Sequence, residues 1–207
     1  MIQLINDDNI KLMQRINNKF FDWGCIDPPY GLGKRLSDGG GKLKNTPMAA
    51  LYRNKDWDVL PTKEFWFEFN RITKNQIIFG ANYFLDYLPP TRGFVVWDKL
   101  NYLTTLSACE LIYTSLDKPA KIYRESSMDL QRFHPTQKPV GLYKFMYNYC
   151  NLKEGDHIFD AFLGSGSSAI AAYDYNLNFT GCEIDKEYFI KANNRLENHK
   201  KQLTIKF

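Results

Sequence analysis

The stretch Trp23-Gly24-Cys25-Ile26-Asp27-Pro28-Pro29-Tyr30 decides the fold class. Its first four residues form an apolar run, which predicts a buried strand of an α/β sheet. Pro28 and Pro29 lack the N–H that a sheet needs, so the chain must leave the sheet after Asp27. Asp27 and Tyr30 are therefore predicted at the carboxyl edge of the strand, where open α/β sheets bind ligands. A carboxylate, a fixed carbonyl acceptor and a flat ring suit a planar molecule that carries an amino group.

The residues before this stretch predict a βαβ unit. Residues 1–5 form a short apolar segment that is expected to be a strand. Asn6-Asp7-Asp8 ends it and can cap a helix, whose apolar face carries Ile10, Met13 and Ile16. Strand, helix and strand in this order imply a parallel sheet.

The remainder of the chain continues as predicted strands and helices. Further strands are predicted at residues 76–80, 93–97, 108–113, 120–123, 157–160 and 179–183. Further helices are predicted at 61–73, 81–88 and 169–174, and another follows Pro139 and runs through Tyr149. The fold class that this pattern indicates is α/β.

The length of 207 residues suits one domain, and two segments within it are candidate insertions for partner contact, 31–58 and 114–133. The first carries a glycine triplet among basic residues and is predicted to be a long flexible loop. Its function would be contact with nucleic-acid phosphates, and the alternative is a solvated linker. The basic residues of this loop are Lys34, Arg35, Lys42 and Lys44.

Composition narrows the class of protein further. The net charge of +4 is compatible with a polyanionic partner. The four cysteines form no C-x-x-C pair and are expected to be buried free thiols of a reducing compartment. The three histidines are far apart, so no metal site is predicted. An early pair of aspartates argues against a signal peptide, and no apolar run reaches membrane-spanning length, so a soluble intracellular protein is expected.

A second group of residues lies near the end of the sequence. The predicted strand 157–160 runs into Asp160-Ala161-Phe162-Leu163-Gly164-Ser165-Gly166-Ser167-Ser168, and Glu183 ends the next strand. Glycines let a ligand approach the backbone, the helix N-terminus offers free N–H groups, and an acid there can accept both hydroxyls of a ribose. A P-loop is excluded because no Gly-Lys-Ser/Thr follows, and the third glycine of a dinucleotide motif is replaced by Ala169. The pattern favours a nucleoside of another kind, and the alternative is an ordinary glycine-rich turn.

Together these two groups resemble the amino-group DNA methyltransferases that use S-adenosylmethionine. Residues 27–30 look like their catalytic motif and residues 160–166 like the motif that holds the methionine moiety. Residues 181–185 are similar to their ribose-binding strand end, and His134-Pro135-Thr136-Gln137-Lys138-Pro139 resembles the segment that precedes the cofactor motif. This permuted order is that of the beta group, and phage and prophage adenine methyltransferases are similarly short.

The resemblance implies a three-layer Rossmann-like methyltransferase fold with a mostly parallel sheet and circularly permuted motifs. Residues 1–5 would then supply the strand that follows the ribose strand, and Asp27 and Gly164 should lie at neighbouring strand ends. The residues implied to be catalytic are Asp27, Pro28, Pro29 and Tyr30. Those implied to bind the cofactor, S-adenosyl-L-methionine, are Asp8, Asp27, Pro28, Thr136, Gln137, Lys138, Asp160, Phe162, Gly164, Ser165, Gly166, Ser167, Glu183 and Ile184. DNA contacts are expected from Lys34, Arg35, Lys42, Lys44 and Arg132.

The function implied is methyl transfer to the N6 amino group of an adenine that has flipped out of duplex DNA. Asp27 and the Pro28 carbonyl would each accept an amine hydrogen, and Tyr30 would stack on the base. Cytosine N4, an RNA amine and a catalytically inactive nucleic-acid or cofactor-binding module are the alternatives. Such enzymes act in the cytoplasm of a bacterial or phage-infected cell, often in restriction-modification. Dimers occur among them, so monomer and homodimer both stay open.

Overall fold

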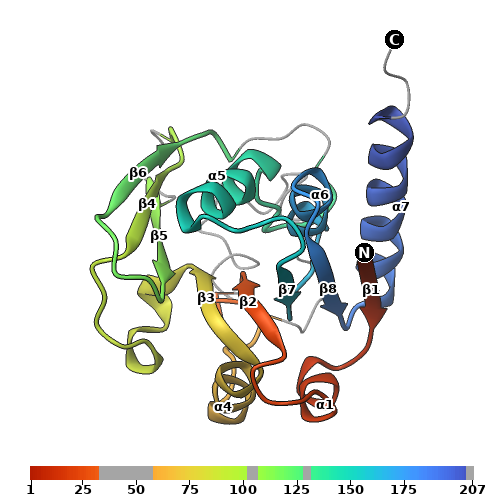
Figure 1. Ribbon diagram of the computed structural model, residues 1–207. Coiled ribbons are helices and arrows are strands. Elements are labelled where there is room, and N and C mark those ends of the chain that lie inside the picture. The colour runs from red at the N-terminus through yellow and green to blue at the C-terminus, as the bar shows by residue number, and fades with distance from the viewer. Residues whose placement is uncertain (33–57, 102–106, 128–131, 204–207) are drawn as a thin grey trace.

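The computed structural model describes residues 1–32, 58–101, 107–127 and 132–203. Its strands are β1 (Ile2–Asn6), β2 (Phe21–Ile26), β3 (Thr73–Phe79), β4 (Phe94–Asp98), β5 (Cys109–Thr114), β6 (Lys121–Arg124), β7 (His157–Asp160) and β8 (Asn178–Glu183). They form one eight-stranded sheet in the order β1-β8-β7-β2-β3-β5-β4-β6 (Figure 1). All strands run in the same direction except β5, which is antiparallel to β3 and β4. The expected mostly parallel sheet is confirmed.

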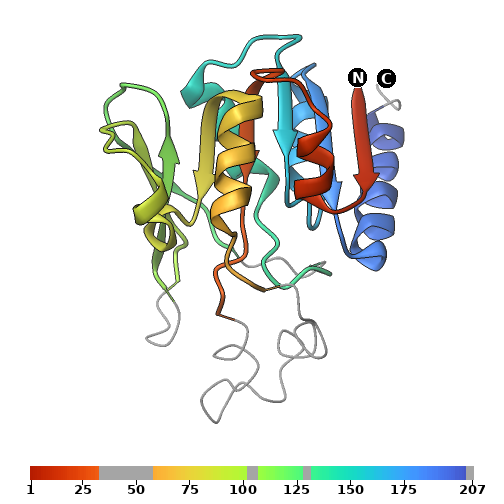
Figure 2. The same ribbon diagram turned by 90° about the horizontal axis from the view of Figure 1, so that it is seen from below.

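Helices cover both faces of this sheet, so the fold has three layers. They are α1 (Asn9–Gln14), α4 (Lys63–Ile72), α5 (Val140–Cys150), α6 (Ser167–Asp174) and α7 (Lys186–Leu203), with 3₁₀ helices η1 (Ala81–Tyr83) and η2 (Leu85–Tyr87). Helices α5, α6 and α7 pack on one face (Figure 1). Helices α1 and α4 lie side by side across the other face (Figure 2).

The core is divided by the sheet into two halves, and the central strands contribute to both. Trp23 and Cys25 of β2 pack toward α5 and α6, whereas Phe21 and Ile26 pack toward α1 and α4. A strand buried on both faces has an apolar run instead of an alternating pattern, which is why the stretch before Asp27 predicted its position correctly.

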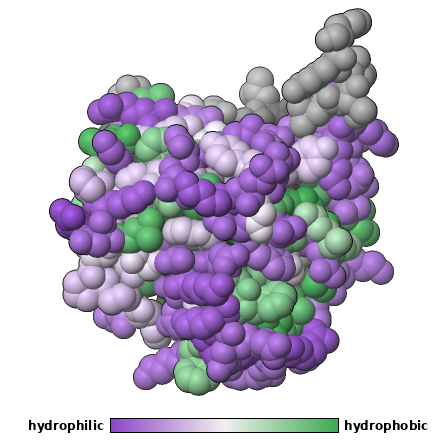
Figure 3. Space-filling view, in the orientation of Figure 1, coloured by the Kyte–Doolittle hydropathy of each residue, from purple (hydrophilic) through white to green (hydrophobic). Residues whose placement is uncertain are grey.

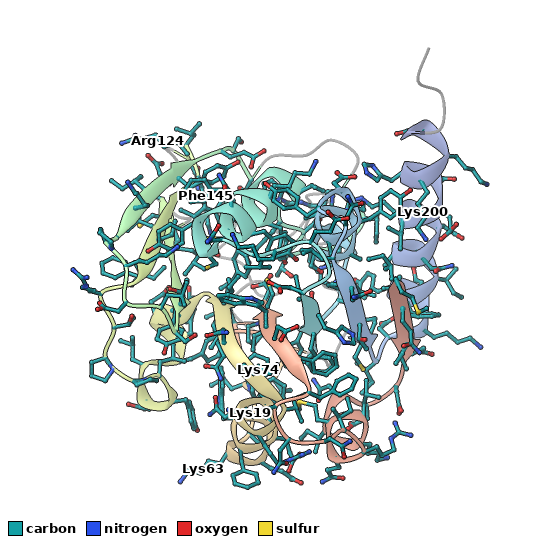
Figure 4. The ribbon with its side chains drawn as sticks, in the orientation of Figure 1. Lys19, Lys63, Lys74, Arg124, Phe145 and Lys200 are labelled. Carbon is teal, nitrogen blue, oxygen red and sulfur yellow. The ribbon has the colours of Figure 1, made fainter. Side chains whose placement is uncertain are left out.

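Helix α4 has side-chain hydrogen bonds at both of its ends. Thr62 caps its N-terminus by accepting a hydrogen bond from the N–H of Phe65 at 3.2 Å. At its other end the Lys19 ammonium, which lies beside the helix in Figure 4, donates to the carbonyl oxygens of Asn70 and Thr73, each at 2.8 Å. A cation at a helix C-terminus satisfies free carbonyl groups and complements the helix dipole.

The structure differs from the predictions at three places. The helix expected at 81–88 is two 3₁₀ helices, because Gly80 in a left-handed conformation begins the segment and Pro89-Pro90 ends it before an α-helix can form. Strand β3 begins at Thr73, earlier than expected, since Thr73 pairs with Phe21. Cys109 is exposed, unlike the three buried cysteines, because it is the first residue of β5 and lies at the end of that strand.

The face of the molecule drawn in Figure 3 is mostly hydrophilic. On the face that Figure 3 shows, hydrophobic residues form small separate patches among hydrophilic ones. Within the described ranges, no helix combines the length and the apolar character that crossing a membrane requires.

Candidate active site

A cavity of about 360 Å³ lies at the carboxyl ends of β2, β7 and β8. Strands β2 and β7 are parallel neighbours, with Trp23 beside Ile158. Asp27 follows the first and Gly164 follows the second, so the two lie at neighbouring strand ends and line the same cavity, as expected. Strand β1 pairs with β8 in parallel, which confirms the expected place of residues 1–5 beside the ribose strand.

Asp27 is held through one of its two carboxylate oxygens. Its Oδ1 accepts a hydrogen bond from the Tyr30 hydroxyl at 2.7 Å and from the Lys138 ammonium at 2.6 Å. Within the described residues, no hydrogen bond from the protein reaches its Oδ2. The side chain is 11% exposed, so one oxygen is fixed while the group still borders the cavity.

Tyr30 has a fixed ring as well as a bonded hydroxyl. Its ring stacks on Tyr83 of η1, with the centroids 4.5 Å apart and the planes 14° from parallel. Gly80 lies against the same ring, and its φ of +63° is a conformation that glycine adopts most easily. The left-handed turn before η1 therefore makes the space that Tyr30 occupies.

Two residues that the sequence analysis did not select complete this group. Glu110 of β5 lies with Oε2 3.4 Å from the Lys138 ammonium and 3.3 Å from the Tyr30 hydroxyl. Its Oε1 forms an ion pair with Lys99. An acid within the otherwise apolar strand predicted at 108–113 was the signal that could have indicated it.

These charges act on one another in a buried place. Burial raises the pKa of Asp27, and Lys138 opposes this rise while Glu110 adds to it. Burial alone would lower the pKa of Lys138, but Asp27 and Glu110 raise it above its ordinary value. Burial alone would raise the pKa of Glu110, and the ammonium groups of Lys138 and Lys99 hold it below its ordinary value. The group therefore favours charged lysines paired with the two acids.

The glycine-rich turn after β7 also lines the cavity. Glu183 accepts a hydrogen bond from the Gly164 N–H and another from the Asp185 N–H, both at 2.8 Å. Gly164 has a φ of +51°, and a Cβ there would lie 3.3 Å from the His134 ring. Burial raises the pKa of Glu183, and the backbone hydrogen bonds partly oppose it. A carboxylate thus lies beside an open backbone turn.

Asp160 supports this turn from inside. It accepts hydrogen bonds from the Ser168 hydroxyl at 2.6 Å and the Phe162 N–H at 2.9 Å. Burial raises its pKa to about 7 despite these bonds. Ser167 donates to the carbonyl oxygen of Lys138 at 2.7 Å and so connects the start of α6 to the segment before α5.

The predicted site residues other than Arg132 fall into three sets. Those that line the cavity are Asp27, Pro28, Pro29, Tyr30, Thr136, Gln137, Lys138, Phe162, Gly164, Ser165, Glu183 and Ile184. Those near the cavity but not in its lining are Asp8, Asp160, Gly166 and Ser167. Lys34, Arg35, Lys42 and Lys44 lie outside the described residues.

Asp8 and Arg132 each make hydrogen bonds within the protein. Asp8 caps α1 by accepting from the Lys11 N–H at 2.9 Å, and its neighbour Asp7 lines the cavity instead. Arg132 donates to the carbonyl oxygens of Pro135 at 3.4 Å and Gln137 at 3.3 Å, so it braces the segment that carries Lys138.

Similar proteins were found by sequence and by structure. Type II methyltransferase M2.DpnII of Streptococcus pneumoniae is 25% identical over 245 residues, covering 94% of this chain and 89% of that protein. The M1.HpyAVI–SAM complex superposes with a TM-score of 0.62 at 21% identity, covering 95% of this chain and 100% of the other. PvuII DNA methyltransferase, described as cytosine-N4-specific, has a TM-score of 0.63 at 12% identity, covering 96% and 89%. These two structures establish the likeness of fold.

A family model described as DNA methylase, whose name covers N6 and N4 methyltransferases, matches residues 52–194. Because this match covers more than half of the chain, the protein belongs to the N6/N4 DNA methylase family.

Proposed function

We propose that this protein is a site-specific DNA methyltransferase that methylates the exocyclic N6 amino group of an adenine flipped out of duplex DNA. The observation that carries the proposal is the cavity at the strand ends. Asp27 lines it, and so does the turn at Gly164 together with Glu183. Family membership supports a DNA amino-methyltransferase, and the finer choice of adenine rests on Asp27.

Glu183 and the glycine-rich turn at Gly164 fit S-adenosylmethionine as the cofactor. Glu183 can accept hydrogen bonds from ribose hydroxyls, since each of its oxygens uses one lone pair on a backbone N–H. The backbone at Gly164 is open to a ligand, and a Cβ there would crowd His134. A volume of about 360 Å³ is within the range of small-molecule sites. When bound, the cofactor supplies an activated methyl group. We assign the cofactor contact expected of Asp8 to Asp7, because Asp7 lines the cavity.

Asp27 prepares the target amine. The nitrogen of a base amine is a poor nucleophile because its lone pair is delocalised into the ring. Asp27 accepts one N–H and the Pro28 carbonyl accepts the other, which directs the lone pair away from the ring plane. As the nitrogen gains positive charge, the carboxylate stabilises it electrostatically. Tyr30 and Lys138 keep the carboxylate in one orientation, so it need not reorganise.

Tyr30 lines the cavity and is the residue we assign to base stacking. A base inside a duplex cannot present its amine to a buried carboxylate, so it must flip out. Stacking on an aromatic ring contributes about 1–3 kcal/mol per base. One face of Tyr30 is stacked on Tyr83, which fixes the ring before a base arrives.

Segments 31–58 and 114–133 of the single domain are the parts that we assign to DNA contact. The first begins and ends at the cavity, because the Gly31 N–H donates to the Asp58 side chain at 2.9 Å. Both Asp58 and Leu60 line the cavity. A strand that delivers a flipped base would therefore pass this segment. The lysines and arginine within it are expected to give binding that weakens with salt.

Cytosine N4 is the second candidate target. Its amine also lies beside a ring nitrogen, and the similarity of fold to a cytosine-N4-specific enzyme keeps it in consideration. Asp at position 27 favours adenine by the pattern of the family that the sequence resembles.

Transfer of a labelled methyl group tests the function, with duplex DNA and RNA compared as acceptors. Sequencing of DNA from cells that express the protein then reports base and target site. Asp27→Ala should abolish transfer while cofactor binding, followed by calorimetric titration, survives in part. An active Asp27→Ala enzyme would contradict the mechanism. A wild-type protein that binds the cofactor and methylates neither nucleic acid would favour the inactive binding module.

A further inference from the structure

We propose that Lys138 and Glu110 are positioning residues for Asp27. Lys138 fixes its Oδ1 and opposes its charge, Glu110 helps to hold Lys138 and Tyr30 in place, and Oδ2 is left to the amine of the substrate. The part about the amine rests on the proposed function, whereas the effect on Asp27 itself does not.

The first observation behind this proposal is the set of contacts that the Lys138 ammonium makes. It lies 2.6 Å from Asp27 Oδ1, 3.0 Å from the Tyr30 hydroxyl and 3.4 Å from Glu110 Oε2. An ammonium group has three N–H donors, of which one is directed at Asp27 and one at Tyr30, while Glu110 faces the ammonium as an ion pair. Lys138 was expected to contact the cofactor, but its donors are directed at the catalytic group. It therefore acts through Asp27.

The second observation is that these charged side chains are buried. The side chains of Lys138 and Glu110 are 3% and 10% exposed, and that of Asp27 is 11% exposed. A buried carboxylate without a cation nearby becomes neutral by taking up a proton, and a proton on Asp27 would remove the negative charge of the acceptor. Two acids here face two ammonium groups, those of Lys138 and Lys99. The charges of these four side chains balance when all of them are ionised.

Glu110 affects Asp27 in two opposing ways. Its charge repels the Asp27 carboxylate, while its Oε2 helps to hold the Lys138 ammonium and the Tyr30 hydroxyl in place. Lys99 neutralises the far side of Glu110. Removing the charge of Glu110 should therefore favour ionised Asp27, and removing that of Lys138 should disfavour it. A role in packing alone would not give opposite signs.

The charge environment of Asp27 includes groups on every neighbouring element. Besides Lys138 and Glu110, these are Tyr30, Lys99, Tyr143 on α5, Asp160 on β7 and Cys25 on β2. Burial raises the pKa of Cys25, Tyr30 and Tyr143 well above their ordinary values, so these groups stay neutral near neutral pH. Asp160 is the additional acid that can titrate, and it is left unchanged in the variants below.

The direct test is titration of Asp27 in the full-length protein without substrate. Aspartate labelled with carbon-13 at the carboxyl group is followed by NMR, and Asp27→Asn identifies the signal. Lys138→Gln should raise the midpoint by roughly 1–3 pH units, and Glu110→Gln should lower it. Lys138→Arg keeps the charge and should restore most of the shift. Lys144→Gln removes a cation of α5 that is paired with Asp174, and it should leave the midpoint unchanged.

Methyl transfer gives the second readout. The acid limb of the kcat profile should move to higher pH in Lys138→Gln and to lower pH in Glu110→Gln. Shifts of the same sign, or no shift in either variant, would overturn the proposal. If Lys138→Gln does not fold, as judged by thermal unfolding, the other two variants provide the test. Glu110→Gln should still lower the midpoint of Asp27, and Lys138→Arg should leave it close to that of the wild type. A wild-type protein without transfer activity would refute the proposed function and leave the NMR test of Asp27 intact.

Discussion

Replacing Gly80 by alanine is expected to destabilise the protein through Tyr30. Gly80 has a φ of +63°, a left-handed conformation that costs a residue with a Cβ about 1–2 kcal/mol. The new Cβ would also lie 2.6 Å from the Tyr30 hydroxyl oxygen and closer still to two ring carbons. Displacing a packed ring costs roughly 1–3 kcal/mol more, so the free energy of unfolding should fall by about 2–5 kcal/mol.

Gly155 supplies the matched control. Its φ is +86°, and no heavy atom lies within 4 Å of the position of a Cβ. Gly155→Ala should therefore cost only the backbone contribution of about 1–2 kcal/mol, measured by urea unfolding. In a Tyr30→Ala background the overlap at Gly80 disappears, and Gly80→Ala should cost no more than Gly155→Ala. An undiminished cost in that background would show that the contact with Tyr30 is not the cause.

The same change tests the active site. If Tyr30 moves, Asp27 loses a hydrogen bond of 2.7 Å to its charged oxygen. Such a bond contributes about 1.5–3 kcal/mol, which corresponds to roughly a ten- to hundredfold loss in kcat. Cofactor affinity should change little, because the hydrogen bonds that hold Glu183 and Gly164 do not involve Tyr30. A Gly80→Ala enzyme with normal kcat at saturating substrates would refute the reasoning.

Three further changes test other parts of the structure. Glu183→Ala should weaken cofactor binding by roughly ten- to hundredfold in calorimetric titration, with a smaller change in kcat, and unchanged binding would contradict the ribose contact. Asp160 has a pKa of about 7 in the folded protein, above its ordinary value of 3.8, so its neutral form stabilises the fold at low pH. That contribution, up to roughly 4 kcal/mol, is lost as pH rises from about 4 through 7. The measurement is the free energy of unfolding of the wild type minus that of Asp160→Asn, and this difference should fall over the same pH range. Arg71→Lys should lower the unfolding free energy by about 1–3 kcal/mol, because one ammonium cannot replace the guanidinium bonds to the carbonyl oxygens of Ile16 and Met13, each at 2.7 Å.

The parts of the site that could be predicted from sequence are those with local signals. Asp27 follows an apolar run and precedes two prolines, and Gly164 follows another run and precedes a helix. Each signal indicates a strand end, and parallel strands bring their carboxyl ends to one edge. That Asp27 and Gly164 line one cavity follows from these rules together with the resemblance. By contrast, Asp7 and Asp8 are adjacent in sequence, and only the cap of α1 shows which of them the helix uses.

The buried charges around Asp27 could not be predicted in this way, and strand direction explains why. Had β5 been parallel to its neighbours, Glu110 near its beginning would lie at the opposite edge of the sheet from Asp27. Strand β5 is antiparallel to β3 and β4, so its beginning lies beside their carboxyl ends. Lys99 directly follows β4 and reaches the same edge. A single reversed strand thus brings an acid and its lysine to Asp27, and the apolar pattern of β5 is the same in either direction.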